Sequence, residues 1–270
     1  MIELQAKSVP SFMRALLVTE PHYPAEYWFF RGQADARWGL VPSSRREAAW
    51  ERFGGAARLG LSCRDGFVVS SDDDLRAVEM SLLDTLKQVM DRVGLPPHLL
   101  ADPARVAFAQ HIGLPTRLLD WTRSPWTAAY FAAASAAQRA DSPGSLAVYA
   151  MSAVFLGTGS RMAEVERLDV GGAGNPNLVA QQGVLLRVPR EQIDLLDGVT
   201  IESRSLDYQP TETEARQLEN HLLRITLPWS EAGALLKRLR SQELHAASIY
   251  PGHVGVAELV REVFVTEPGA

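Results

Sequence analysis

Several features that mark common classes of protein are missing from this chain of 270 residues. Its single cysteine, Cys63, excludes an internal disulfide framework and a cysteine-based zinc site, and favours a reducing compartment. No apolar run approaches the roughly 20 residues that span a bilayer. The start of the chain has no basic region followed by an apolar stretch. We therefore expect a water-soluble, cytoplasmic protein with no membrane contact.

An excess of basic charge is also missing. Lys and Arg together number 27 and Asp and Glu 32, so the formal net charge is −5. This charge gives no overall attraction to nucleic acid, and any such contact needs a local patch. The sequence has no His-x-x-x-His spacing and no Gly-x-Gly-x-x-Gly, Walker or Gly-x-Ser-x-Gly motif. We expect no bound metal, and we do not expect a Rossmann, P-loop or α/β-hydrolase enzyme.

What is present is an ordinary globular composition, with 46% apolar and 22% charged residues. There is no internal repeat and no low-complexity segment, so we expect one domain over residues 1–270. Strands interrupted by helices of uneven length predict the α+β class, with small mixed or antiparallel sheets and surrounding helices.

Hydrophobic periodicity and capping residues place the expected elements. Helices are predicted at about residues 43–53, 72–93, 103–111, 124–140, 230–244 and 254–263. Strands are predicted at about residues 26–32, 116–121, 145–151, 181–188, 221–227 and 246–250. Residues 54–70 are expected to form a loop, and the glycine-rich residues 157–177 a mobile loop.

Residues 109–132 carry the strongest indication of a functional site. A Gly-Pro turn, a short strand and a helix follow one another here, and polar side chains stand among apolar ones. These polar residues are His111, Arg117, Asp120, Thr122 and Arg123. Burying charge is costly unless it is paired. A core-like segment with this many polar groups therefore predicts a site.

Arg31 is a second candidate, because it stands at the end of the aromatic strand predicted at residues 26–32. A guanidinium there can make a bidentate contact with a phosphate or carboxylate. The alternative is a structural ion pair with Asp35 or Glu26. The residues alone leave both interpretations open.

The triplet Asp120, Trp121 and Thr122 falls where a strand gives way to a helix that Ser124 caps. The free backbone N–H groups at a helix start favour anions, a pyrophosphate included. The alternative is that Asp120 and Thr122 serve only to cap the helix and fix the turn. Trp121 would stack on a flat ring or, as tryptophan more often does, pack in the core.

Two further positions have both a functional and a structural interpretation. His111, at a predicted helix end, would transfer a proton or pair with Asp120, or would only cap the helix. Gln181 opens a strand, where its amide would bond a ribose hydroxyl or satisfy loop backbone. The basic cluster between Arg45 and Arg64 has interspersed acidic residues, which favour a solvated face over a phosphate site.

These blocks together resemble the FRG domain family, named for its Phe-Arg-Gly motif. The resemblance spans about residues 25–262. It rests on Phe30–Gln33, Leu40–Ser43 with Arg46, Ala109–Thr122, Ser124–Pro125, Ala129–Ala132, Asn175–Asn177 and Gln181–Gly183.

The order of these motifs is in turn similar to the ADP-ribosyltransferase superfamily, which implies an ADP-ribosyltransferase-like core. In that superfamily a first-strand arginine holds NAD, a second strand bears Ser/Thr-x-Ser, and a later strand carries a catalytic glutamate. The resemblance places Arg31 at the arginine, Asp120 to Thr122 at the second position, and Gln181 at the glutamate. Two positions depart from the pattern: Asn177 stands where the FRG family usually has arginine, and Gln181 cannot ionise.

The resemblance therefore implies an enzyme that uses NAD as substrate, without a metal, to modify a protein or nucleic acid. A bacterial toxin or anti-phage defence effector, with an antitoxin or partner protein, is the expected setting. In this hypothesis the catalytic residues are Arg31, Asp120 and Gln181. The residues that bind NAD are Arg31, Gly32, His111, Arg117, Asp120, Trp121, Thr122 and Gln181. The alternatives are a nucleotide or RNA sensor without catalysis and an interaction module.

Overall fold

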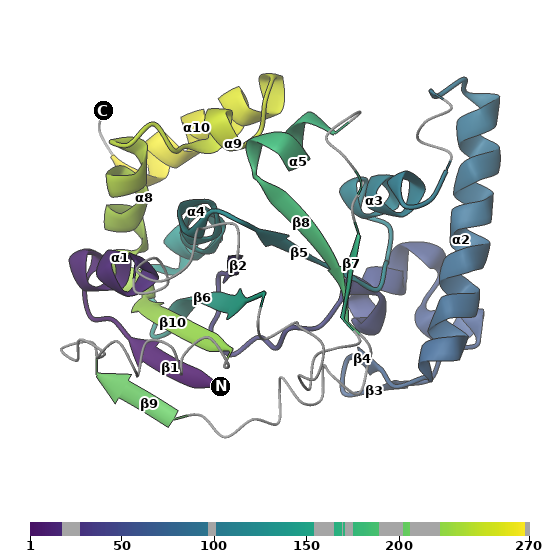
Figure 1. Cartoon of the computed structure of the whole chain (residues 1–270), viewed down its shortest axis with the longest axis horizontal. Coiled ribbons are helices and arrows are strands. Elements are labelled where there is room, and N and C mark those ends of the chain that lie inside the picture. The colour runs from purple at the N-terminus through teal and green to yellow at the C-terminus, as the bar shows by residue number, and fades with distance from the viewer. Residues whose placement is uncertain are drawn as a thin grey trace.

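A computed structural model describes residues 1–17, 28–96, 101–153, 165–168, 170, 175–188, 202–205 and 222–267, the segment 202–205 by its backbone alone. Its centre is an eight-stranded mixed sheet in the order β7-β8-β5-β2-β6-β10-β1-β9 (Figure 1). The mixture of helices with this sheet confirms the α+β class. The main sheet is larger than the small sheets that the sequence predicts.

Neighbouring strands of the sheet run antiparallel except for β10–β1 and β1–β9, which are parallel. The strands are, in sheet order, β7 (Glu166–Leu168), β8 (Gly183–Arg187), β5 (Leu118–Thr122), β2 (Trp28–Gln33), β6 (Ser145–Ser152), β10 (Leu223–Pro228), β1 (Ile2–Gln5) and β9 (Glu202–Ser205). Five of the expected strands are confirmed within a few residues. The strands β7, β1 and β9 are additional to the predicted ones.

One group of helices gathers at the β2-β6-β10-β1 part of the sheet. It comprises α1 (Val9–Leu17), α4 (Pro125–Ala136), η6 (Ala137–Arg139), η7 (Trp229–Glu231), α8 (Ala232–Arg240), α9 (Ala246–Ile249) and α10 (His253–Thr266). Of these, α1 and α4 contact the strands and the other helices pack outside them. The alanine-rich α4 lies against β2, where a Cβ atom at Gly32 would stand only 1.9 Å from the Ala128 carbonyl oxygen. Gly32 therefore lets the strand and the helix approach closely.

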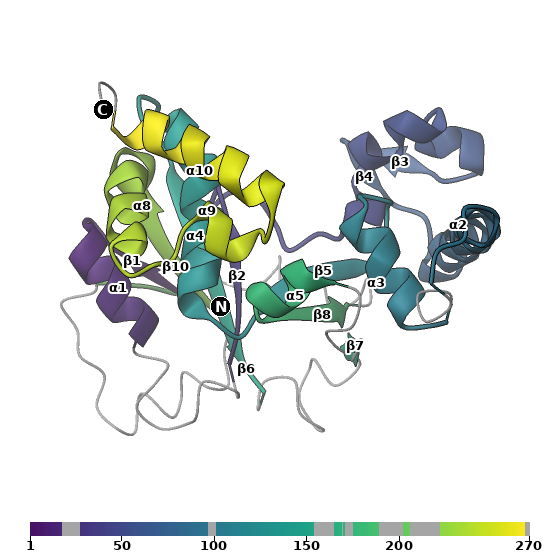
Figure 2. The same cartoon turned by 90° about the horizontal axis from the view of Figure 1, so that it is seen from above.

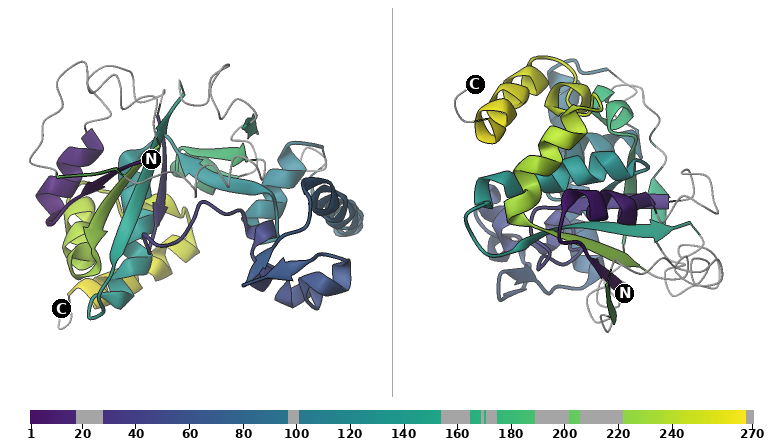
Figure 3. Two further views of the ribbon diagram at one scale, coloured as in Figure 1. Left: turned by 90° about the horizontal axis from the view of Figure 1, so that it is seen from below. Right: turned by 90° about the vertical axis from the view of Figure 1, so that its left-hand side faces the viewer.

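A second group of elements surrounds the other end of β5 and β8. It comprises η2 (Ser43–Arg45), η3 (Glu47–Phe53), η4 (Ala56–Leu59), the hairpin β3 (Cys63–Arg64) and β4 (Phe67–Val68), α2 (Asp72–Arg92) and α3 (Ala104–His111). The predicted helices at 72–93 and 103–111 are confirmed as α2 and α3. A capping box of Ser71 and Asp74 starts α2. Figure 2 and the left panel of Figure 3 show the two groups at opposite ends of the molecule, with α5 (Pro176–Ala180) between them.

Four local predictions differ from the structure. Residues 43–53 form 3-10 turns with no side-chain cap in place of one capped helix, and residues 54–70 hold η4 and the hairpin in place of a loop. The strand predicted at 246–250 is wrong: this segment is α9, because His245 and Ser248 form a reciprocal cap that starts a helix. Most of the predicted mobile loop at 157–177 lies outside the described residues, and within its described part Glu166–Leu168 form the strand β7 in place of a loop. Among the described helices, none combines the length and the apolar character that a membrane span requires.

The sheet opens between β2 and β5. A single residue pair, Phe30 with Thr122, joins these two strands, whereas β2 pairs with β6 over six residues and β5 pairs with β8 over five. Arg31, which follows the paired Phe30 on β2, reaches across the opening to the main-chain carbonyl of Asp120 on β5. This split in the sheet is where the candidate site lies.

Candidate functional site

A cavity of about 740 Å³ lies at the split in the sheet. Its size is within the range of small-molecule sites, which is roughly 300–1,000 Å³. Its walls come from five stretches of the chain, within residues 30–46, 107–122, 131–135, 175–185 and 250–254. Both helical groups therefore contribute to it, and β2, β5 and β8 lie between them.

Most of the residues that the sequence predicts for the site line this one cavity. They are Arg31, Gly32, His111, Asp120, Trp121, Thr122 and Gln181. Arg117 is not among the lining residues. The three strands that carry or adjoin the predicted motifs, β2, β5 and β8, are neighbours in the sheet, which is why distant parts of the sequence meet here.

Arg31 spans the opening between β2 and β5. Its Nη1 donates a hydrogen bond of 2.5 Å to the main-chain carbonyl of Asp120, and its Nε is buried without a hydrogen-bond partner. The predicted alternative, an ion pair with Asp35, is not formed, because that carboxylate binds Arg37 at 2.7 Å and Arg139 at 3.5 Å. Glu26, the other alternative partner, lies outside the described residues.

A second guanidinium, that of Arg46, lines the same cavity. Burial lowers the pKa of Arg31, and the positive charge of Arg46 lowers it further. The negative charge of Asp120 raises it in part. Burial also lowers the pKa of Arg46, again opposed by Asp120. Asp120 is the only carboxylate among the described lining residues, so the two guanidinium groups leave an excess of positive charge.

The Asp120 carboxylate is oriented by Gln110 on α3 and, through Gln110, by Thr116 just before β5. The Gln110 side-chain amide donates to Asp120 Oδ2 at 2.7 Å, and the Thr116 hydroxyl donates to Gln110 Oε1. Gln110, rather than the predicted His111, is therefore the side chain that holds Asp120. His111 itself is exposed at the end of α3, where it lines the cavity.

Thr122 ties the end of β5 to the turn before β8. Its hydroxyl donates to the Gln181 carbonyl at 2.6 Å and accepts from the Ser124 N–H at 3.0 Å. The Gln181 side-chain amide donates to the Ile249 carbonyl at 3.3 Å, which joins this turn to α9. Thr122 thus fixes the backbone of Gln181, and the Gln181 side chain reaches the cavity wall.

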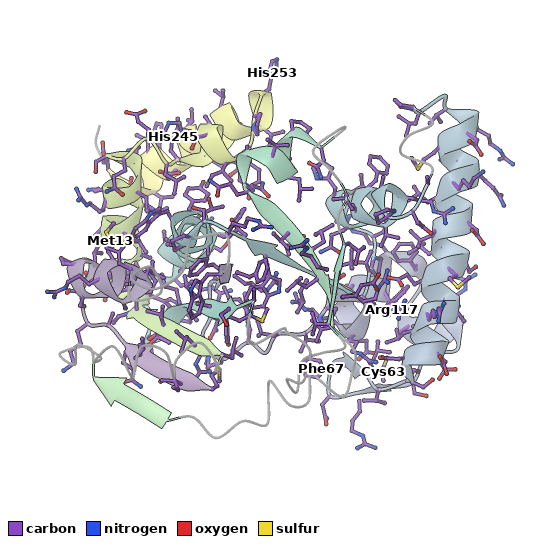
Figure 4. All side chains as sticks on the ribbon, viewed as in Figure 1. Met13, Cys63, Phe67, Arg117, His245 and His253 are labelled. Carbon is purple, nitrogen blue, oxygen red and sulfur yellow. The ribbon has the colours of Figure 1, made fainter. Side chains whose placement is uncertain are left out.

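The structure places two predicted features outside the cavity. Arg117 donates from its backbone N–H and its Nε to the buried Glu79 on α2, at 2.9 and 2.8 Å, so it links β5 to α2 (Figure 4). The start of α4, residues 124–127, does not line the cavity, although Ser124 caps it as predicted. Later residues of that helix, Phe131 and Ser135, line it instead.

Several lining residues escape the sequence analysis. Trp38, Phe131 and Tyr250 add aromatic rings, and Tyr250 lies far from every motif, so no sequence signal identifies it. Trp121 is 3% exposed and packs in the core, and it also lines the cavity; that it stacks on a flat ring stays a prediction. Within the part of the chain that the structure describes, no three His, Cys, Asp or Glu side chains gather as a metal site.

Comparison with known families supports part of the resemblance. Residues 26–141 match the family model of the FRG domain. The matched segment contains Arg31, Arg46, Gln110 and Asp120, and ends before Gln181 and the α9–α10 wall. Neither the curated proteins nor the solved structures gave a match to this chain.

Proposed function

We propose, taking residues 26–141 as an FRG domain, that this protein binds NAD in the cavity and transfers its ADP-ribose group to a protein or nucleic acid. One observation carries the proposal. Arg31 holds a buried Nε without a partner at the split in the sheet, beside a second guanidinium and a single carboxylate.

The charges of the cavity support an anionic ligand. The lowered pKa values of Arg31 and Arg46 show that burial disfavours the charged form of each group, and Arg46 adds repulsion at Arg31. An anion between them would offset both effects, and guanidinium groups bind phosphate oxygens in a bidentate manner. The pyrophosphate of NAD supplies such an anion.

The apolar part of the cavity supports a ligand with flat rings. Trp38, Phe131 and Tyr250 line it together with the backbone of the strands. Aromatic side chains stack on one another and on flat ligand rings in offset or edge-to-face geometry. The adenine and nicotinamide rings of NAD fit this chemistry.

In the proposed reaction, the residues that line the cavity would act on NAD as follows. The bond between C1′ of the nicotinamide ribose and the ring nitrogen breaks, and its electron pair leaves with nicotinamide. A nucleophile of the acceptor then bonds to C1′ and releases its proton to water. Positive charge develops on the ribose, and Asp120, held by Gln110, is the lining carboxylate that would stabilise it. Arg31 would hold the pyrophosphate and Gln181 a ribose hydroxyl.

A second function, recognition of a nucleotide without turnover, rests on Gln181. Where the superfamily pattern has an ionisable glutamate, this chain has a neutral amide that bonds the Ile249 carbonyl. A pocket with that amide can orient a ribose and still lack the second acid. Consumption of NAD separates the two functions.

The test is to incubate the protein with NAD labelled in its adenine ring, with and without cell lysate, and to follow free nicotinamide and labelled macromolecules. The transferase proposal expects both products, and expects Arg31→Lys to lose them. Arg37→Lys is the matched control, because this arginine is 78% exposed and does not line the cavity. Thermal stabilisation by NAD without its consumption would indicate the sensor. Neither turnover nor stabilisation would reject both functions.

A further inference from the structure

Helix α10 buries two polar side chains beside Leu259, which packs on the core, and leaves several large apolar side chains exposed. Glu262 and Thr266 are buried, together with Gly255. On the outside, large apolar side chains are between 47% and 71% exposed. They are Val254, Val256, Val260, Phe264 and Val265. A helix of a globular protein normally buries its apolar face, so this arrangement indicates a surface that another molecule covers.

Three of the exposed side chains form a stripe along α10. Val256, Val260 and Phe264 are four residues apart and so lie one above another on the helix. The 14 residues of α10 extend over about 21 Å. The neighbouring helices α8 and α9 pack on the other side, and α10 lies along the outside of the molecule (Figure 2).

We propose that this apolar face binds the same face of a second copy of this chain, with the two α10 helices antiparallel about a two-fold axis. Glu258 and Arg261 flank the stripe on one side. Within one copy Arg261 donates to Glu258. When the axis passes between residues 259 and 260, the two such pairs lie side by side, with Arg261 of each copy also facing Glu258 of the other copy. The surface is therefore complementary to itself in charge, as a two-fold interface requires.

The charges of α10 favour a second copy over a lipid surface. Helices that lie on membranes carry several Lys or Arg residues beside the apolar face. The exposed part of α10 has one acid and one base, Glu258 and Arg261, in addition to His253. This balance gives no net attraction to anionic lipid, but it supplies both partners of an ion pair between two copies.

The size of the stripe determines how strong the association is. Stable specific interfaces bury about 1,200–2,000 Å² in total, and one helix pair of about 21 Å contributes less than that. We therefore expect a dimer that forms reversibly with concentration. Its site adjoins the cavity, because Tyr250, Pro251 and Val254, at the start of α10 and just before it, line the cavity. Pairing would hold this wall in place, and the inference does not depend on the proposed function.

The first test measures molecular mass against concentration by sedimentation or light scattering. The wild-type chain should pass from monomer to dimer as its concentration rises. Phe264→Asp should weaken the dimer by about tenfold or more, since it places a charge within the apolar contact. Val93→Asp, at a 65% exposed valine just after α2, should leave the dimer unchanged. Because Phe264 is 71% exposed, the variant should keep its thermal midpoint.

The second test addresses the antiparallel register. Glu258→Arg and Arg261→Glu should each weaken the dimer, and the double variant should restore it, because the exchanged charges again face opposite partners. A wild-type chain that stays monomeric at every concentration would overturn the proposal, as would a dimer that Phe264→Asp leaves intact. A monomer that sediments with anionic lipid vesicles would assign the stripe to a membrane instead. Failure of the double variant to restore the dimer would overturn the antiparallel arrangement.

Discussion

The position of Arg31 is unfavourable for the stability of the protein and favourable for binding. Burial lowers its pKa, and its Nη1 donates to a main-chain carbonyl rather than to a carboxylate. A cation in this position is desolvated without a full partner, so replacing it with an apolar side chain relieves a cost. A residue kept under such conditions is typical of a functional site.

The first prediction follows from this contrast. Arg31→Met should abolish the thermal stabilisation by NAD while the protein without ligand melts at the same temperature or higher. Arg117→Met is the comparison, because Arg117 pairs with the buried Glu79 at 2.8 Å. Its loss leaves an unpaired buried carboxylate and should cost about 3–5 kcal/mol. If both variants lose stability equally, Arg31 is a structural residue and the anion site is rejected.

The sequence identifies both arginines but not the difference between them. Arg31 and Arg117 each stand in a motif at the edge of a predicted strand. They differ in their partners, because Arg117 pairs with the carboxylate of Glu79 on α2, 38 residues earlier in the sequence. Local pattern carries no information on such a contact. For the same reason Gln110, which holds Asp120, is found only in the structure.

At the scale of elements, the contact between β2 and α4 depends on Gly32. An added Cβ would meet the Ala128 carbonyl oxygen at 1.9 Å, so Gly32→Ala must push the strand from the helix. We expect a loss of about 1–3 kcal/mol in unfolding free energy, together with weaker NAD binding, because Arg31 is the preceding residue.

A second glycine provides the control for that substitution. Gly233 lies in α8, and its Cβ would meet no atom within 4 Å. Gly233→Ala should therefore raise stability by roughly 0.5–1 kcal/mol, the gain usual for alanine within a helix. Chemical unfolding of both variants measures the two effects. A Gly32→Ala protein as stable as the wild type would show that β2 and α4 do not require this approach.

The next prediction concerns pH and the buried side of α10. Burial raises the pKa of Glu262, although the charge of Arg240 opposes this effect. The folded protein therefore keeps the proton to higher pH than the unfolded chain, so stability falls as pH rises from the unfolded pKa through the folded one. The charged and titratable groups around it are Tyr130, Arg240, His245, Tyr250, Glu258 and Glu267.

Glu262→Gln should remove this loss. Near neutral pH the variant should be more stable than the wild type, and the difference should shrink below about pH 4, where the wild-type carboxyl is protonated in both states. Arg240 keeps Glu267 as its partner in the variant. Unfolding free energies across this pH range measure the effect. A variant that is less stable at neutral pH would show that Glu262 acts mainly as the ion-pair partner of Arg240.

The elements that the sequence predicts well are those with long, regular patterns. The 21 residues of α2 show the periodicity of a helix, and β6 is an apolar run that is buried nearly throughout. Residues 246–250 are too short to separate strand from helix by pattern, and the cap formed by His245 decides for the helix. The strand β9 has the polar sequence Glu-Ser-Arg-Ser at the edge of the sheet, which gives no strand signal.

At the scale of the whole molecule, the sequence predicts which motifs line the cavity but only some of the other residues in its walls. The motifs meet because β8, β5 and β2 are adjacent in the sheet. The opening between β2 and β5 is a property of strand pairing, which no single segment contains. The α9–α10 wall comes from the far end of the chain, beyond the FRG match. The cavity is therefore a product of the complete fold.

This organisation leads to a prediction about ligand binding. Residues 107–111 belong to one helical group and residues 250–254 to the other, and both stretches line the cavity. A ligand that fills the cavity should slow hydrogen exchange at both places together. At a ligand concentration of 100 times the dissociation constant, binding raises the free energy of the local opening that permits exchange by about 2.7 kcal/mol. The hairpin at residues 63–68 does not line the cavity and should exchange as before. Hydrogen exchange with and without NAD measures this, and protection confined to one wall would show that the two helical groups do not enclose a common ligand.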